Sequence, residues 1–594
     1  MYNVSTAYKQ EIEKPVRNPS HIRITFGITN TDAVAVSTAT DNGHLSYSDV
    51  NSVDLGLSVA SPYATLEPKR WLLNGAFSIA NLSNPTYQGY IGNELSNAQG
   101  EWSINPTITI NFSDYQQFAG LSFEFDNNGR EWHPESFKVE ALKDGTGVFN
   151  KTFSPTDEYF VINDQIPPCN EIIITYLKNN NPFSRARLEG LIYGIVERMT
   201  AADISACNCT REVDLISSSY PKYDFNFTIF DKNGEYNPEN PQGVWEYLET
   251  RQPVQVAIGY ELNSGNIEWM PWANTYTSGE FSVNGTGINT KVEIKSVGLI
   301  NHLTQEYGEG KYYENGRSLY DLAYDVMNYA GFGGAIEVDE SLKNIISMQP
   351  LPIDKINNLL QLIANAGRCV LNVERGGTIS IKPEKTTVED FTMDFSKMSD
   401  FPETSKIPML RYINFTYSTV SVGENQEELY TSEEITADEP TEYTFTYDTA
   451  TNQDYTKSTT LTVSNVSHFA NKTVMTLQGT GTVTIKGNRL IYNEAVASKR
   501  YHELGTDLDT LSNELVTNEA DANAYIDWIA AYEMRRNTYS IADRGYPELD
   551  TGDTVNFVST YLNNITATQL SSTIEYNGAI KNTASKYLIK EVEQ

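Results

Sequence analysis

Residues 224–230 read Asp-Phe-Asn-Phe-Thr-Ile-Phe, residues 252–260 read Gln-Pro-Val-Gln-Val-Ala-Ile-Gly-Tyr, and residues 291–295 read Lys-Val-Glu-Ile-Lys. Each run alternates apolar and polar side chains, which is the period-two pattern of a half-buried strand. Further alternating runs lie between residues 211 and 303, joined by segments rich in Asn, Asp and Gly, the residues of tight turns. Several short strands at this spacing predict an antiparallel barrel, closed or nearly closed, over 211–303.

The amino-acid sequence of the same stretch resembles that of a known protein family. Residues 249–260, Glu-Thr-Arg-Gln-Pro-Val-Gln-Val-Ala-Ile-Gly-Tyr, and residues 267–271, Ile-Glu-Trp-Met-Pro, resemble the tail hub proteins of bacteriophages. These are baseplate-hub or tail-tip proteins that continue a tail tube. A second match covers 544–553, where Arg-Gly-Tyr-Pro-Glu-Leu-Asp-Thr-Gly-Asp resembles the second tube barrel of the hubs. Thr-Ile-Glu-Tyr-Asn-Gly at 573–578 resembles a late strand of that barrel with its cap.

The resemblance implies a mainly β protein with an α+β part. Two tube-type antiparallel β barrels are joined by a small α/β domain, and β-sandwich modules are inserted into them. The expected division is a first hub barrel from 1–58 plus 198–303, an inserted jelly-roll or carbohydrate-binding-like module at 59–197, an α/β inter-barrel domain at 304–400, a second hub barrel from 401–420 plus 505–594, and a small β insertion at 421–504. A chain of 594 residues has room for several such domains.

Residues 304–400 change from the period of a strand to that of a helix. Ser318 precedes the first apolar-periodic run and forms a capping box with Asp321, which predicts a helix that begins there. A second helix is predicted over 354–367, and a strand hairpin over 368–381. The hub family has this helix–helix–hairpin order in its inter-barrel domain.

The segment 59–197 has its own series of predicted strands, separated by Gly, Asn, Asp and Pro, which favours a β-sandwich or jelly roll. The run Tyr-Ala-Thr-Leu-Glu-Pro-Lys-Arg-Trp-Leu-Leu-Asn-Gly at 63–75 resembles the opening of discoidin-type jelly rolls. Pro-Thr-Ile-Thr-Ile at 106–110 and Arg-Ala-Arg-Leu at 185–188 resemble later parts of the same modules. Many of those modules bind carbohydrate through loops at one end.

Two loops of this segment combine aromatic rings with planar polar groups. Sugars need this pairing, because a ring face stacks on the sugar while donors and acceptors bind its hydroxyls. The candidate carbohydrate-binding residues are Tyr87, Tyr90, Asn127, Arg130, Trp132 and His133. The alternative is that Tyr87 and Trp132 pack on the loops in which they lie. Trp71, beside a Leu-Leu pair, is expected in the core.

The chain is strongly acidic, with a formal net charge of −34 and an isoelectric point near 4.5. Contacts to phosphates need Lys and Arg, so this balance argues against a general nucleic-acid binder. The charge is either a solvated surface that aids solubility or an acidic lumen through which DNA slides without sticking. No run approaches the ~20 apolar residues of a membrane helix, and residues 1–6 carry no secretion signal, so we expect a chain made in a cytoplasm.

No catalytic or metal-binding motif stands out. The six histidines form no His-Glu-x-x-His motif and no close pair, so a zinc peptidase lacks its ligands. Cys207 and Cys209 are too close to bridge each other and are predicted to lie in a turn between two strands. We expect no enzyme, no metal and no cofactor. A glycosidase with a pair of carboxylates stays open, because the sequence does not give the geometry of its many Asp and Glu residues.

The resemblance implies a structural virion protein of the tail tip or baseplate, assembled in the host cytoplasm. Three copies with two barrels each make a six-fold pseudo-ring that matches a hexameric tail tube and surrounds the DNA channel. The implied partners are two further copies in a homotrimer, the distal tail protein and tail tube proteins, the tape measure protein, receptor-binding proteins or fibres, a host surface glycan held by 59–197, and DNA that passes without specific binding. The alternatives are a carbohydrate-binding host adhesin that uses the barrels as a scaffold, and a tail-associated cell-wall hydrolase.

Overall fold

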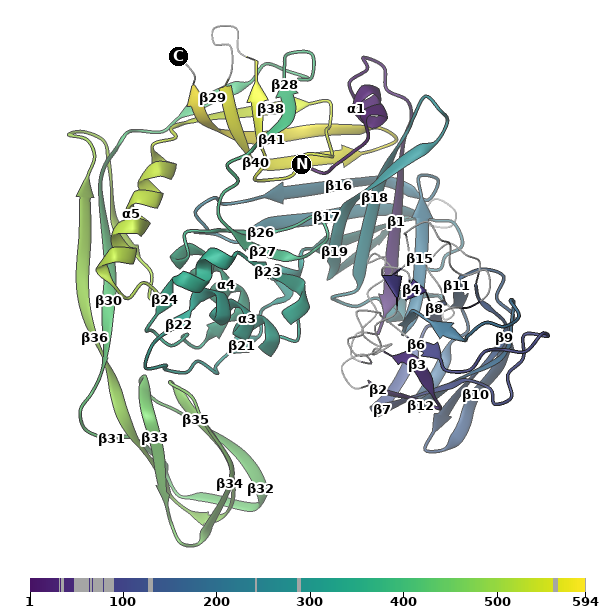
Figure 1. Cartoon of the computed structure of the whole chain (residues 1–594), viewed down its shortest axis with the longest axis horizontal. Coiled ribbons are helices and arrows are strands. Elements are labelled where there is room, and N and C mark those ends of the chain that lie inside the picture. The colour runs from purple at the N-terminus through teal and green to yellow at the C-terminus, as the bar shows by residue number, and fades with distance from the viewer. Residues whose placement is uncertain are drawn as a thin grey trace.

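The computed structural model describes residues 1–30, 33, 37–47, 63–64, 67, 78–79, 90–125, 132–240, 243–285, 290–558 and 565–592. Figure 1 shows a broad sheet at the top with a helical part beneath it, a compact β module on the right and a long β module at the lower left. Within these residues, no helix has both the length and the apolar character needed to cross a membrane.

A 13-stranded sheet runs through the molecule and takes strands from both ends of the chain. Its order is β15 (Gly194–Thr200), β1 (Ser20–Thr29), β18 (Pro253–Glu261), β19 (Ile267–Asn284), β20 (Thr290–Val297), β17 (Lys222–Asp231), β16 (Ile204–Glu212), β40 (Ile565–Tyr576), β41 (Ile580–Val592), β38 (Asn537–Asp543) and β29 (Glu403–Lys406). Two further strands branch from β40, namely β39 (Thr554–Phe557) and β28 (Val388–Met393). The first seven strands form an N-terminal set and the other six a C-terminal set.

The two sets join because β16 pairs antiparallel with β40. Cys209 lies opposite Ile574 and Thr210 opposite Thr573. The predicted fold class, mainly β with an α+β part, is confirmed, and the strands expected in two barrels share one sheet. The turn predicted at Cys207 and Cys209 was wrong. Both thiols are buried within β16, because their alternation with polar residues is itself a strand pattern.

The α/β part lies under this sheet and follows its prediction closely. The helix α3 (Leu319–Tyr329) begins at Ser318, whose side chain accepts a hydrogen bond from the backbone N–H of Asp321, so the predicted cap is confirmed. The helix α4 (Ile356–Ala366) packs against α3. The predicted hairpin is confirmed as β26 (Val370–Val373) and β27 (Ile379–Lys382), and β23 (Ile336–Val338) adds a parallel strand to it.

The inserted module leaves the sheet at the end of β1 and returns at the start of β15, where Thr29 lies opposite Gly194. Gly194 has φ +148°, and a Cβ there would lie 2.0 Å from the Ile28 carbonyl oxygen, so only glycine fits this close crossing. The module is a β-sandwich whose core contains a cluster of aromatic rings around Phe137.

One layer of the sandwich is β10 (Thr146–Phe153), β9 (Pro134–Lys143), β12 (Ile166–Asn179), β7 (Thr107–Phe118) and β2 (Ser37–Asp41). Facing it are β11 (Tyr159–Ile162), β8 (Leu121–Glu124), β14 (Gly190–Ile192), β13 (Arg187–Leu188), β6 (Tyr90–Gly92) and β3 (His44–Tyr47). The strands β2 and β3 precede residue 59, where the module was expected to begin. They belong to the sandwich because they pair with β7 and β6.

The second insertion starts at β30 (Leu410–Val422), which pairs with β36 (Val483–Arg500) and β37 (Thr506–Ser512). We expected 401–420 in the second barrel, but only the short β29 of that segment joins the sheet. The buried side of β30 instead packs on α5 (Glu519–Glu533), with the rings of Phe415 and Tyr525 4.3 Å apart. The rest of the module consists of β31 (Glu427–Thr431), β32 (Ile435–Thr446), β33 (Ala450–Lys457), β34 (Leu461–His468) and β35 (Lys472–Gly481).

An N-terminal arm, residues 1–19, crosses between the two strand sets. Its helix α1 (Thr6–Ile12) buries Tyr8 completely, edge-on to the ring of Tyr260 on β18 at 5.3 Å. At the other side of the arm, the backbone N–H of Tyr2 donates to the carbonyl oxygen of Glu548 at 2.8 Å. The arm therefore contacts the N-terminal strand set at β18 and, in the C-terminal set, the segment that connects β38 with β39.

We expect Tyr8→Ala to destabilise the protein by about 3–5 kcal/mol, because it empties the space of a fully buried ring. Limited proteolysis should then cut within residues 1–19 faster, and the melting temperature should fall. Tyr115→Ala is the matched control, since its ring is 53 % exposed. Equal cleavage rates in the two variants would show that the arm is not held by Tyr8.

Candidate functional site

Middle strands of the 13-stranded sheet, such as β16 and β17, have one buried face and one largely polar face. Alternate side chains, such as Phe227 on β17, are buried in the core, whereas those between them, such as Asn226, are mostly polar and partly exposed. The side-chain amide of Asn226 donates to Asn208 Oδ1 at 3.3 Å. Across the joint of the two strand sets, the hydroxyls of Thr210 and Thr573 lie 3.2 Å apart. The polar face therefore continues from the N-terminal set to the C-terminal set.

Several charged side chains on this polar face form ion pairs. Along β20 they alternate in sign, and surface ion pairs of this kind contribute little to stability. Within the described residues the face therefore offers a phosphate backbone neither a run of cations nor a run of anions. The pairs are Lys295 with Glu280 (2.6 Å), Lys581 with Glu575 (3.2 Å) and Lys222 with Asp224 (3.4 Å).

Behind the sheet, one carboxylate binds two buried arginines. Asp550, in the motif at 544–553, accepts from Arg211 of β16 and from Arg375 of the β26–β27 hairpin, the latter at 2.7 Å. Arg211 also donates to the Tyr223 hydroxyl at 2.7 Å and to the Trp272 carbonyl at 2.9 Å. Burial opposes ionisation of Asp550, but the two guanidinium groups outweigh it and lower its pKa. This cluster ties both strand sets to the α/β part.

The sequence analysis missed this cluster. Arg375 lies within the hairpin predicted over 368–381 and Arg211 begins the barrel stretch predicted over 211–303, and neither was singled out. The signal that would have found it is the period of β16: Arg211 occupies an inward position in register with Cys207 and Cys209. A charged residue at an apolar position of an alternating strand requires a buried partner.

A second carboxylate in the same motif, that of Glu548, is also buried, but within the described residues it forms no ion pair like those of Asp550. Glu548 is 3 % exposed, and its Oε2 atom has no hydrogen-bond partner in the described part of the chain. Burial raises its pKa from 4.5 to about 7, against the lowering effect of Arg17 and Arg375. Glu548 lies under the N-terminal arm, since its carbonyl accepts from Tyr2.

The predicted carbohydrate-binding residues are only partly placed. Tyr90 is completely buried in the sandwich core, and its hydroxyl donates to the Gly43 carbonyl at 3.2 Å. Trp132 is 6 % exposed, so neither ring is open for a sugar to stack on. His133 is half-buried, with Nδ1 3.0 Å from the Pro134 carbonyl oxygen. Outside the described residues lie Tyr87, Asn127 and Arg130, and also Trp71.

The four cysteine thiols are buried and free, and burial raises the pKa of Cys169 to about 11 and of Cys369 to about 12. These thiols are therefore protonated and act as small apolar core groups. Among the described residues, no group of three His, Cys, Asp or Glu side chains is placed to hold a metal ion.

No protein-family model matches this chain, and no curated protein matches it. Among solved structures, it is similar to a 43 kDa tail protein of prophage MuSo2 from Shewanella oneidensis, at 12 % identity over 66 % of this chain and 95 % of that chain, with a TM-score of 0.37. A tail protein from Neisseria meningitidis MC58 gives 10 % identity, 66 % and 93 % coverage, and a TM-score of 0.40. A family 32 carbohydrate-binding module of C. perfringens NanJ, in complex with galactose, gives 10 % identity over 30 % of this chain and 99 % of that module, with a TM-score of 0.18. Because these identities and TM-scores are low, the function is inferred from the residues of this chain.

We expect Glu548→Gln to remove a pH dependence of stability. Since the folded-state pKa of about 7 exceeds the unfolded value of 4.5, the wild type is most stable below pH 4.5 and loses this contribution as the pH rises to about 7. The variant, which stays neutral, should be more stable than wild type at pH 8, by up to about 3 kcal/mol, and nearly equal at pH 4.5.

Urea unfolding at the two pH values measures this difference. Glu239→Gln is the control, because Glu239 is exposed and should change neither curve. If wild type and Glu548→Gln differ equally at both pH values, Glu548 does not titrate between them.

Proposed function

We propose that this chain is a structural hub protein of a bacteriophage tail tip or baseplate, and that three copies form the ring that adapts the tail tube to the tip. The observation that carries the proposal is the joint between β16 and β40, which fuses two strand sets into one sheet with a continuous polar face. The hub-like sequences at 249–271 and 544–553 lie in the two halves joined by this sheet.

In this proposal, each chain supplies two tube-like units, so three chains supply six and match a hexameric tail tube. The polar face lines the channel, where its paired charges and small hydroxyl and amide groups let DNA pass without specific binding. The partners are the distal tail protein, the tail tube and tape measure proteins, and receptor-binding proteins or fibres. The protein acts without catalysis in the virion, after assembly in the host cytoplasm.

An apolar patch at the far end of the sheet supports contact between copies. Among the described strands, β29 is the last of the sheet and pairs with β38, and its neighbours Phe395, Phe401, Ile407 and Met409 are exposed. Leu504 extends the patch, because the residue two positions on, Thr506, donates to the Met409 carbonyl at 2.7 Å. Phe401 is 83 % and Leu504 82 % exposed, and a cluster of exposed large apolar side chains is typical of an interaction surface.

The opposite edge of the sheet is closed by side chains. Along β15, Ser122 donates to the Gly194 carbonyl at 3.0 Å and accepts from the Val196 N–H at 3.1 Å. The backbone N–H of Thr200 donates to the side chain of Asp203 at 3.1 Å. An edge satisfied in this way resists strand addition. We therefore place the protomer contact at the β29 end.

A second function, binding of host surface glycans by the inserted sandwich, is favoured by a polar cavity at its border with the N-terminal strand set. It is compatible with the hub, whose sandwich then serves in attachment. If glycan binding is the main role, the protein is an adhesin with hub-like strands as its scaffold.

Light scattering of the purified chain tests the hub. We expect a salt-resistant trimer of about three times 66.6 kDa, because an apolar contact is insensitive to ionic screening. The double variant Phe401→Ser and Leu504→Ser should dissociate it, whereas Ile104→Ser, at a site 68 % exposed on the inserted module, should not. A wild type that stays monomeric at every concentration contradicts the trimer.

A further inference from the structure

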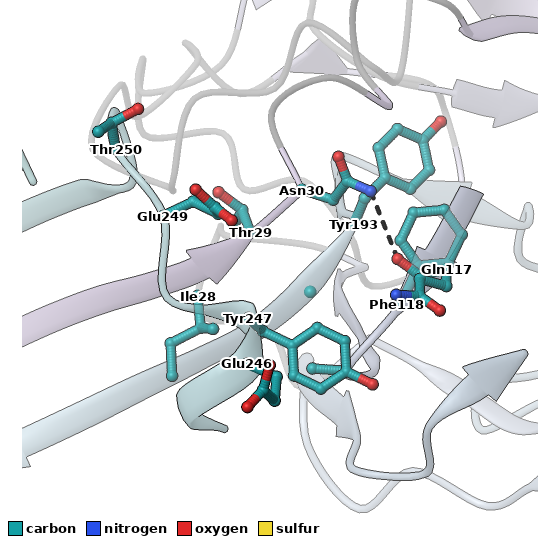
Figure 2. A pocket seen from close by; sticks show the side chains of 12 residues that line it. Ile28, Thr29, Asn30, Gln117, Phe118, Tyr193, Glu246, Tyr247, Glu249 and Thr250 are labelled. Carbon is teal, nitrogen blue, oxygen red and sulfur yellow. Dashed lines mark hydrogen bonds between the residues drawn. The ribbon is translucent and has the colours of Figure 1, made fainter. Parts of the chain in front are cut away.

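A cavity of about 260 Å³ lies where the inserted sandwich meets the N-terminal strand set. One wall is the end of β1 together with the 3-10 turn η2 (Trp245–Tyr247) and the residues after it. The other wall is the β7–β8 connection and the crossing at Gly194. Figure 2 shows side chains from both walls around this space, with Glu246 and Tyr247 on one side and Asn30 and Gln117 on the other.

Each wall is held by hydrogen bonds of a side-chain amide. Gln252 is completely buried, and its Nε2 donates to the Thr29 carbonyl at 3.1 Å and to the Tyr247 carbonyl at 2.7 Å. On the sandwich side, the amide of Asn30 donates to Gln116 Oε1 at 2.9 Å, and its Oδ1 accepts from the Ala33 N–H at 3.1 Å. The cavity is therefore preformed, which reduces the entropy lost when a ligand binds.

Four polar side chains of the lining are available for a ligand. In the described part of the chain, the carboxylates of Glu246 and Glu249, the hydroxyl of Tyr247 and the amide of Gln117 accept or donate no side-chain hydrogen bond. The ring of Tyr247 adds a flat apolar surface beside them, as Figure 2 shows. One ring with several donors and acceptors is the combination that binds a polyhydroxylated ring.

The charge of the lining restricts the ligand further. Neither Lys nor Arg occurs among the described residues that line the cavity, while two carboxylates do. A ligand with a carboxylate or phosphate would lie against like charges, whereas an ammonium group would be attracted. The cavity volume suits a unit of monosaccharide size.

We infer that this cavity binds a neutral or amino-bearing saccharide unit and excludes acidic sugars. The inference rests on the proposed glycan-binding role of the insertion, and it moves the site from the loops at 85–90 and 127–134 to the border of two modules. Tyr247 stacks on the sugar ring, and Glu246, Glu249 and Gln117 bind its hydroxyl or ammonium groups. The sandwich alone supplies only one of the two walls.

Calorimetric titration of the full chain with glucosamine, N-acetylglucosamine and glucuronic acid tests the inference. We expect the first two to bind and glucuronic acid to bind at least roughly tenfold more weakly. Tyr247→Leu should weaken glucosamine binding roughly tenfold, because it removes the ring. Glu239→Gln, an exposed glutamate of the neighbouring loop, is the matched control and should bind like wild type.

A specificity reversal makes the test sharper. The double variant Glu246→Lys and Glu249→Lys should lose glucosamine and gain glucuronic acid, since it reverses the charge of the cavity. If wild type binds none of the three sugars, or if Arg130→Ala abolishes binding that Tyr247→Leu leaves intact, the inference is wrong. Light scattering on the same samples separates the two proposals. A trimer that binds no sugar would support the hub role and contradict the sugar site, whereas a monomer that binds sugar would contradict the trimer and support the sugar site.

Discussion

The architecture depends on the contact of one carboxylate with two buried guanidinium groups. Asp550 holds Arg211, which belongs to the strand that joins the two sets, and Arg375, which belongs to the α/β hairpin. Removal of the carboxylate would leave both largely buried cations without this counter-charge, and the loss of one partner of a buried ion pair typically costs about 3–5 kcal/mol. Because the partners come from three distant parts of the chain, the pairing also fixes how those parts are oriented.

Local rules of the sequence predicted the elements, and long-range pairing decided their arrangement. The cap at Ser318, the helix that follows it and the hairpin after α4 depend on residues a few positions apart, so the sequence shows them. The pairing of β16 with β40 joins residues more than 350 positions apart, and no local pattern encodes it. The same limit explains β30, whose alternation fits a barrel strand equally well until its buried side meets α5.

The candidate sugar-binding residues could not be predicted for a different reason. Residue type alone cannot distinguish a buried aromatic side chain from an exposed one. Tyr90 and Trp132 have the right chemistry for a sugar, yet both are buried, and Tyr90 belongs to the sandwich core. Tyr247 and Glu246 were not singled out, since they lie in the barrel segment, far in sequence from the module whose border they form. The acidic charge is distributed unevenly as well: between Glu424 and Arg489 there are ten acidic and four basic residues, whereas the polar face of the sheet is paired. That module carries six of the chain's 34 excess negative charges.

The position of Thr29 opposite Gly194 has a consequence for how such a chain diversifies. The sandwich is inserted between Thr29 and Gly194, which lie opposite each other on neighbouring strands. In the topology of the large sheet it therefore takes the place of the loop of a hairpin. Recombination at these two positions can replace one module by another of any length while the strand register on either side stays unchanged. An exchanged module therefore has to match the large sheet only at this crossing and at the contacts beside it, such as those of Ser122 with β15.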